Sequence, residues 1–309
     1  MTKFLVRRFF ASLLVVFGVV TLVFFILRAV PGDPVESILG EQALELDKQV
    51  LRDCLNLDEP LFVQYKLFWA DVFNGTLGEL CDERGVTVIE RLQDNIPATF
   101  ELALAAMLFA ILLGIPLGII ASLRPYSWVD NTSAVIALLG ISIPNFWLGP
   151  MLLIFFSLTL QVLPNPGSEM AGLTALVLPA ITLGTALSAK LMRMTRSSML
   201  EILSKDFVRT AKAKGLSRFT VIVKHTLRNA LVPVVTIVGL QFGALLTGAI
   251  IVEKVFARPG VGTMLLDGIE ARNYLIVQGC VLFISFTYIV VNLLTDLFYG
   301  IVDPRIRYD

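Results

Sequence analysis

The chain has 309 residues, of which 56% are hydrophobic and only 16% charged, and its mean hydropathy is +0.79. This composition is too apolar for a single water-soluble domain and predicts a protein that crosses a membrane several times. The net charge is zero, but residues 32–100 hold fourteen acidic and five basic side chains, whereas residues 193–228 hold nine basic and two acidic ones. We therefore expect these two segments to face different aqueous compartments.

Six uncharged runs are long enough to cross a hydrocarbon layer of ~30 Å as helices. They are residues 9–27, 102–123, a span within 131–163, 171–189, 229–252 and 273–295. The predicted fold class is therefore an all-α membrane protein with six transmembrane helices. An even number of crossings places both termini on the same side.

The basic residues predict the orientation of these crossings. With the N-terminus in the cytoplasm, sixteen of the 25 Lys and Arg residues fall in cytoplasmic segments. Those segments are residues 1–8, 124–130, 190–228 and 303–309. Because basic residues accumulate on the cytoplasmic side of membrane proteins, we expect both termini to be cytoplasmic.

A long segment, residues 31–98, separates the first two crossings, and we expect a small external helical domain there. Helical spacing over residues 43–57 places Leu44 and Leu51 on one face, and residues 61–73 predict a second, aromatic-rich helix. A core of this size is small, so we expect it to lean on the membrane portion or on a partner. A lid, a docking surface and an inert spacer are all consistent with this pattern.

Two of the three cysteines, Cys54 and Cys81, fall in this external segment. A disulfide is chemically permitted outside the cytoplasm, and a bridge and two free thiols both remain open. Cys280 lies in an apolar run and is most simply a buried small side chain.

Polar side chains within the apolar runs need hydrogen-bond partners or water. Asn145 in the third run and Gln241 in the fifth are the two that we place near a translocation path. Hydrogen bonds between helices are the alternative for both.

The basic block between the fourth and fifth runs reads as a helix, a hinge and another helix. Met199, Leu203, Phe207 and Ala211 recur at helical spacing, so we expect them to form one face of the first helix. At the hinge, Gly215 suits a helix C-terminus that needs a positive φ, and Leu216 and Ser217 suit the residues that follow such an end. Leu216 can supply the hydrophobic contact and Ser217 can cap the next helix.

Two motifs in this block resemble the cytoplasmic coupling loop of ABC importer permeases, in the dipeptide, oligopeptide, nickel and glutathione branch. They are RTAKAKG at residues 209–215 and HTLRNALVP at residues 225–233. Three further stretches fit that branch: PGDP at residues 31–34, FARPGVG at 256–262 and DPRIRY at 303–308. The general permease motif begins with Glu-Ala-Ala, whereas this chain has Arg209-Thr210-Ala211, so the contact made by that glutamate is not carried over.

The resemblance implies a type I ABC importer fold in a bacterial inner membrane and a particular division of the chain. Residues 1–30 would form the N-terminus and first transmembrane helix, residues 31–98 the external domain, and residues 99–309 a five-helix permease core with the coupling loop at 193–228. Implied partners are a second homologous permease, two ATPase subunits carrying ATP and Mg, and an external solute-binding protein. Implied substrates are di- or oligopeptides, which we favour, or glutathione, nickel or a nickel chelate.

The helix that would sit in a groove on the ATPase lies within residues 209–216. Its coupling residues are Arg209, Thr210, Ala211, Lys212, Ala213, Lys214, Gly215 and Leu216. We expect Gly215 to permit the turn, Ala211 and Ala213 to pack closely, and the three cations to face the ATPase.

Several chemistries are missing from the sequence. It contains no G-x-x-x-x-G-K-[ST] loop, so we expect no ATP site and no catalytic residues on this chain. His225 is the only histidine, which argues against a metal site built from several histidines. A passive channel, an ion-coupled carrier and a membrane-bound scaffold remain as competing functions.

Overall fold

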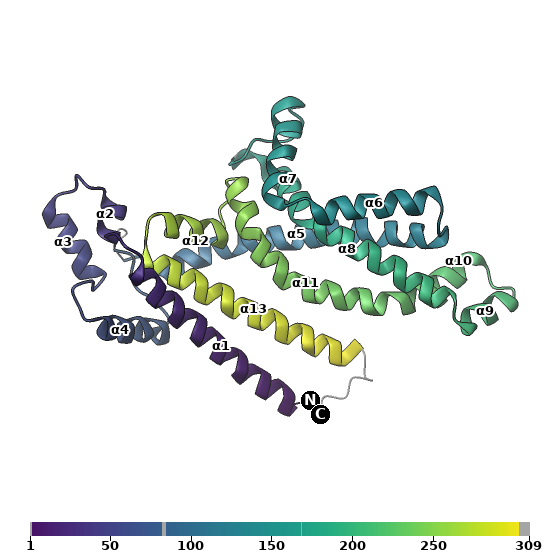
Figure 1. Ribbon diagram of the computed structural model, residues 1–309, viewed down its shortest axis with the longest axis horizontal. Helices are drawn as coiled ribbons and strands as arrows, with labels where there is room; N and C mark the ends of the chain where they lie inside the picture. The colour runs from purple at the N-terminus through teal and green to yellow at the C-terminus, as the bar shows by residue number, and fades with distance from the viewer. Residues whose placement is uncertain (1, 82–84, 168, 303–309) are drawn as a thin grey trace. The chain divides into compact units, whose positions relative to one another are not determined.

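The computed structural model describes residues 2–81, 85–167 and 169–302, and these are helical apart from connecting loops and one isolated bridge between Glu79 and Thr87 (Figure 1). Five helices within the described residues are long and apolar enough to cross a membrane. Each is built mainly from one of α1 (Thr2–Ala29), α5 (Val88–Leu123), α8 (Val177–Leu203), α11 (Arg228–Val255) and α13 (Tyr274–Val302). The third begins at Gly172, before α8, and the fourth at Arg218, before α11. The predicted all-α membrane fold is confirmed. The DPRIRY motif at 303–308 lies outside the described residues.

The third predicted span is a bent pair rather than a straight helix. Helix α6 (Trp128–Ser142) meets α7 (Asn145–Leu152), which continues as η1 (Leu153–Thr159), at an angle of 105°. The residue before a proline is disfavoured in helical conformation, and Ile143 accordingly has φ −82° and ψ 120° in front of Pro144. If this pair counts as one span, the described residues contain six spans.

The described residues form two compact units. Of the described residues, the first unit comprises those up to Thr99 together with Arg258–Val290, and the second comprises Phe100–Ala257 together with residues 291–302. The boundary between them passes through α5 and α13. In the first unit, α12 (Val261–Glu270) packs Val261 and Met264 against apolar residues of the start of α5 and of α13.

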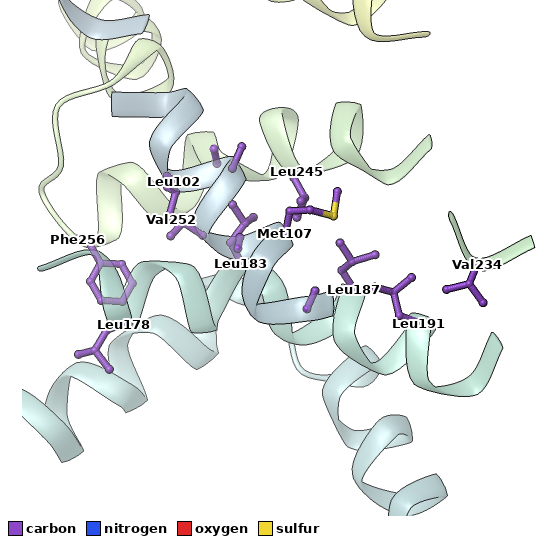
Figure 2. Packing of buried hydrophobic residues seen from close by; sticks show 14 residues of the cluster. Leu102, Met107, Leu178, Leu183, Leu187, Leu191, Val234, Leu245, Val252 and Phe256 are labelled. Atoms are coloured by element: carbon purple, nitrogen blue, oxygen red, sulfur yellow. The ribbon is translucent and has the colours of Figure 1, made fainter. Parts of the chain in front are cut away.

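The core of the second unit forms where α5, α8 and α11 meet, and Figure 2 shows its apolar side chains converging there. Two glycines bring the backbones of α5 and α8 together. A Cβ atom on Gly184 would lie 2.5 Å from the carbonyl oxygen of Ala106, and one on Gly114 would clash in the same way with that of Ser188. Small residues permit this kind of close helix contact in membrane proteins.

The segment between α1 and α5, which belongs to the first unit, contains α2 (Pro34–Leu39), α3 (Glu45–Cys54) and α4 (Leu61–Asn74). Val35, Leu51 and Leu55 form its small apolar core. The prediction that Leu44 shares this face is wrong: it precedes α3 and is 71% exposed. The sequence reading also omitted α2, although Asp33 caps it by accepting a hydrogen bond from the Val35 N–H at 2.9 Å.

The PGDP stretch at 31–34 joins α1 to α2 and is held by two arginines. Arg272 Nη1 donates a hydrogen bond of 2.7 Å to the Pro31 carbonyl oxygen. Gly32 has φ +123°, a conformation that residues with a side chain rarely adopt, so the backbone at this position favours glycine. Arg52 forms an ion pair with Asp33.

A disulfide joins Cys54, at the end of α3, to Cys81, with a Cα–Cα distance of 6.0 Å. The bridge ties the end of α3 to the chain that leads into α5. Cys280 is a free and buried thiol within the core of the first unit.

Candidate coupling site

The basic block lies at one end of the second unit, where α8 ends and the chain passes through α9 (Asp206–Ala213), α10 (Arg218–Thr220) and η3 (Val221–Leu227) into α11 (Figure 1). The prediction of one helix running through this region is wrong. Helix α8 ends at Leu203, and Ser204 Oγ donates to the Glu201 carbonyl oxygen at 2.7 Å, which satisfies one of the free carbonyls at the helix end. Helix α9 then begins after two intervening residues and takes a new direction.

This break changes which side chains face inward. Phe207 is 45% exposed, whereas its neighbour Val208 is fully buried. Val208 packs with Ala211 and Val221, and with the partly buried Ile202 and Leu203. These contacts fix α9 against the end of α8 and the start of η3. Ala211 therefore packs inside the permease end rather than on its outer face.

The hinge after α9 has the geometry that its sequence predicts. Gly215 has φ +73°; its N–H donates to the Lys212 carbonyl oxygen at 3.0 Å, and the Leu216 N–H donates to that of Ala211 at 3.4 Å. This pair of bonds is the Schellman motif, which satisfies the last carbonyls of a helix. Ser217 Oγ then accepts from the Thr220 N–H at 3.3 Å and caps the next turn.

The outer face of this hinge is exposed and basic. Its exposed members are Arg209, Thr210, Lys212, Ala213, Lys214, Gly215 and Leu216, seven of the eight residues that we proposed for coupling. Arg209 pairs with Asp206 at 3.3 Å, while Lys212, Lys214 and Arg218 have no ion pair among the described residues. The face therefore carries uncompensated positive charge.

Two aromatic side chains are exposed on this face: Phe219, which the sequence reading missed, and Phe207, which it placed on the packed face. Phe219 is 75% exposed, and Phe207 projects from α9 beside the cations. A phenylalanine at the first turn of a polar helix is the local signal that could have identified Phe219. Exposed aromatic residues next to Arg and Lys are typical of protein interfaces.

A cavity of about 690 Å³ opens between the hinge and the end of α5. Lys212, Leu216 and Arg218 line it from the hinge, and Ser122 and Pro125 line it from the end of α5 and the loop that follows. Its lining combines apolar contacts, hydroxyl groups and two cations. It can therefore receive a side chain that is apolar along its length and carries an acidic or polar tip.

An ion pair with a buried carboxylate connects the end of α8 to the start of α6. Arg196 on α8 donates from Nε to Asp130 Oδ1 at 2.5 Å and from Nη2 to Oδ2 at 2.6 Å. The Tyr126 N–H also donates to Asp130 at 2.8 Å. A guanidinium and a carboxylate that meet at two points form a strong and directional contact. This pair fixes the loop before α6 to the last turns of α8.

The two residues that we assigned to a translocation path both lie in the second unit, at α7 and α11. Gln241 on α11 accepts a hydrogen bond from Lys190 Nζ of α8 at 3.1 Å. Asn145 is half-buried at the start of α7, and its Nδ2 lies 4.0 Å from the position of a Cβ on Gly248 of α11. Among the residues that the structure describes, no group of three His, Cys, Asp or Glu side chains could hold a metal ion.

The family described as the binding-protein-dependent transport system inner membrane component matches residues 114–308, and its N-terminal counterpart matches residues 1–103. The chain belongs to this family of transport-system membrane components. The permease is 40% identical, over all of its length, to the dipeptide transport system permease protein DppB of Escherichia coli K12, of which the match covers 99%. It is also 40% identical to the glutathione transport system permease protein GsiC of E. coli O6:H1, with all of both chains covered.

Solved structures show that the permease shares the fold of type I ABC importers. The crystal structure of an amino acid ABC transporter with histidines matches with a TM-score of 0.53 at 16% identity, over 77% of this permease and 98% of that chain. Inward-facing MetNI methionine ABC transporter matches with a TM-score of 0.54 at 17% identity, over 69% and 96%. These similarities concern the fold alone.

Proposed function

We propose that this permease is one of two homologous membrane subunits of an ATP-driven importer for di- or oligopeptides. Two ATPase subunits would bind the coupling site, and an external binding protein would deliver the substrate. The full-length similarity to permeases named for dipeptide and glutathione transport supports this substrate class, because glutathione is itself a short peptide. Glutathione is the alternative substrate that these similarities favour.

The exposed face of the hinge carries the proposal of coupling. It combines Phe207 and Phe219 with the free cations Lys212, Lys214 and Arg218, next to the 690 Å³ cavity. Aromatic anchors surrounded by charge suit a groove on a partner that is apolar at its centre and acidic at its rim. The ATPase, which the chain itself lacks, is the partner that a permease of this family requires there.

The inner face of the same hinge explains how force would reach the membrane helices. Val208 and Ala211 pack against the end of α8 and against Val221, which leads into α11. Closure of the ATPases on ATP would move this packed unit, and with it α8 and α11, between two arrangements of the transport path. Such a change requires an interface that binds differently in the two states.

We place Asn145 and Gln241 on the transport path. A lysine inside an apolar helix is costly unless it faces water or a polar partner, and Lys190 meets Gln241. Both termini and the coupling site would face the cytoplasm, and the segment with α2, α3 and α4 would lie outside. The excess of basic residues at the coupling end supports this orientation.

The coupling role is tested by Gly215→Val in the complete transporter reconstituted in liposomes. A β-branched residue is strained at φ +73°, so we expect the variant to insert normally but to lose peptide uptake while its ATPase activity no longer responds to substrate. Gly215→Asn, which tolerates this conformation, should retain uptake.

Gly40→Val is the matched control for this strain. Gly40 has φ +84°, and a Cβ added there, like one added at Gly215, would meet no atom within 4 Å, but Gly40 lies in the external segment. Its replacement should therefore leave coupling intact. Normal uptake by Gly215→Val would refute the assignment of the hinge.

A further inference from the structure

Both faces of helix α4 are mainly apolar, and its polar side chains are Gln64, Lys66, Asp71 and Asn74. Phe68 is buried on the inner face, while Phe62 and Phe73 on the outer face are 66% and 83% exposed. The cation on this helix, Lys66, lies over the Phe62 ring, with its Nζ 4.5 Å from the ring centroid. A helix that faces water on one side normally exposes polar residues there, so α4 has the pattern of a helix surrounded by apolar material.

The inner face of α4 packs along α1 through aromatic contacts, and the two helices lie next to each other in Figure 1. The Tyr65 ring lies 5.1 Å from that of Phe24, and its hydroxyl is 2.8 Å from Thr21 Oγ1. One turn further along α4, Trp69 stacks on Phe17 at 5.1 Å. The contacts therefore progress along α1 from its C-terminal end toward its middle.

These partners place α4 at membrane depth. Phe17, Thr21 and Phe24 all lie inside Arg7–Ala29, the part of α1 that is long and apolar enough to span the membrane. Near the end of that span, Arg28 Nε donates a hydrogen bond of 2.7 Å to Gln64 Oε1 at the start of α4. From Arg28 to Phe17 the helix descends roughly 16 Å, at about 1.5 Å per residue. That distance is about half of a ~30 Å hydrocarbon layer.

We propose that α4 lies in the outer half of the lipid bilayer, beside α1, with Phe62, Leu67 and Phe73 against the acyl chains. We assign lipid to the exposed face because α1, which packs against the opposite face of α4, is itself a membrane span. This inference concerns the external segment and goes beyond peptide import and coupling.

A nitroxide label tests this location in the complete transporter reconstituted in phosphatidylethanolamine and phosphatidylglycerol vesicles. The label is attached to Phe62→Cys and, separately, to Phe73→Cys. Both side chains are largely exposed, so their replacement removes little packing. The native cysteines do not compete, because Cys54 is bridged to Cys81 and Cys280 is fully buried.

Relaxation of the label by oxygen, which dissolves in lipid, is compared with relaxation by a water-soluble nickel chelate. We expect oxygen to dominate at both positions, and the chelate to dominate at the control Asp47→Cys on the exposed side of α3. Dominance of the chelate at Phe62 and Phe73 would place α4 in water and overturn the proposal. Protection from both reagents would show that a protein covers this face, which would also overturn it. Labelling of Asp47→Cys by an impermeant maleimide from outside separately tests the orientation of the segment.

Discussion

Asp130 and Arg196, 66 residues apart in the chain, form a two-point ion pair that joins the start of α6 to the end of α8. The carboxylate is 2% exposed and also accepts the Tyr126 N–H. Neither group could be buried alone at low cost, because an unpaired charge away from water is strongly unfavourable. The pair therefore fixes the α5–α6 loop to the last turns of α8, the helix that precedes α9.

Breaking this pair should destabilise the permease. Arg196→Ala leaves the buried Asp130 carboxylate without its partner, and we expect a loss on the order of 3 kcal/mol in unfolding free energy. Asp130→Asn/Arg196→Gln, which removes both charges, should lose less. Thermal unfolding of the detergent-solubilised permease measures both variants. Equal destabilisation by the single and the double variant would contradict the pairing argument.

Phe219 should matter for assembly but not for folding. Because it is 75% exposed, Phe219→Ala should change the melting temperature little, yet it should weaken ATPase binding by about tenfold if it is an interface anchor. Co-purification of ATPase subunits at increasing dilution measures this. Leu46→Ala, at a residue of α3 that is 76% exposed and lies in the other compact unit, is the control and should not affect assembly.

The contact between α5 and α8 should not tolerate a side chain at Gly184. Even Gly184→Ala would place its Cβ 2.5 Å from the Ala106 carbonyl oxygen, so the two helices would have to move apart. We expect the free energy of unfolding to fall by about 1–3 kcal/mol. Gly18→Ala on α1 is the control, since a Cβ there meets nothing within 4 Å. The melting temperatures of the two variants should therefore differ clearly; similar values would argue against the close approach.

From the Asp33–Arg52 ion pair we predict how the stability of residues 31–81 depends on pH. Partial burial opposes ionisation of Asp33, but the hydrogen bonds from Arg52 and from the Val35 N–H, together with the Arg52 charge, lower its pKa below the usual 3.8. A carboxyl group whose pKa is lower in the folded than in the unfolded protein stabilises the fold at any pH above its unfolded-state pKa. This stabilisation is lost as the pH falls through the folded-state pKa.

Asp33→Asn should therefore destabilise the segment at pH 7 and at pH 5 by the same amount. Its stability and that of the unmodified protein should converge only below about pH 4. Hydrogen exchange of α2 and α3 as a function of pH measures this difference. A difference that changes between pH 7 and pH 5 would point to another titrating group.

The disulfide should stabilise the same segment. Cys54→Ser removes a link between residues 27 apart, for which loop-closure arguments give about 3 kcal/mol. We expect faster proteolysis of residues 31–81 in the variant than in the unreduced protein. Mass spectrometry without reductant should find the two cysteine peptides linked; alkylation of both thiols in the untreated protein would show that the bridge does not form.

Local signals in the sequence predicted the apolar spans and the hinge. Gly215, Leu216 and Ser217 each specify one step of the turn, and no distant residue is needed to form it. The spans follow from uninterrupted runs of apolar residues. Their bends depend on packing as well, so Pro144 indicated a break but not its angle of 105°.

The remaining features depend on contacts that the sequence does not display. Helical spacing continues through Ser204 and Lys205, so the pattern gave no sign that α8 would end there and that Val208 would replace Phe207 in the interior. Asp130 and Arg196 lie on different helices, and neither has a local feature that identifies the other. The sequence indicated an aromatic-rich helix at residues 61–73, but it did not indicate that its aromatic residues would contact α1.

The glycine contacts between α5 and α8 have a mechanical consequence. Where backbones touch without intervening side chains, two helices can neither slide nor rotate against each other without a steric clash. We expect the paired parts of α5 and α8 to move as one stiff unit, so that a displacement at the hinge after α9 is transmitted along both helices. If these two helices do not move against each other, another part of the second unit must bend. We expect this to be the 105° bend at Pro144 between α6 and α7.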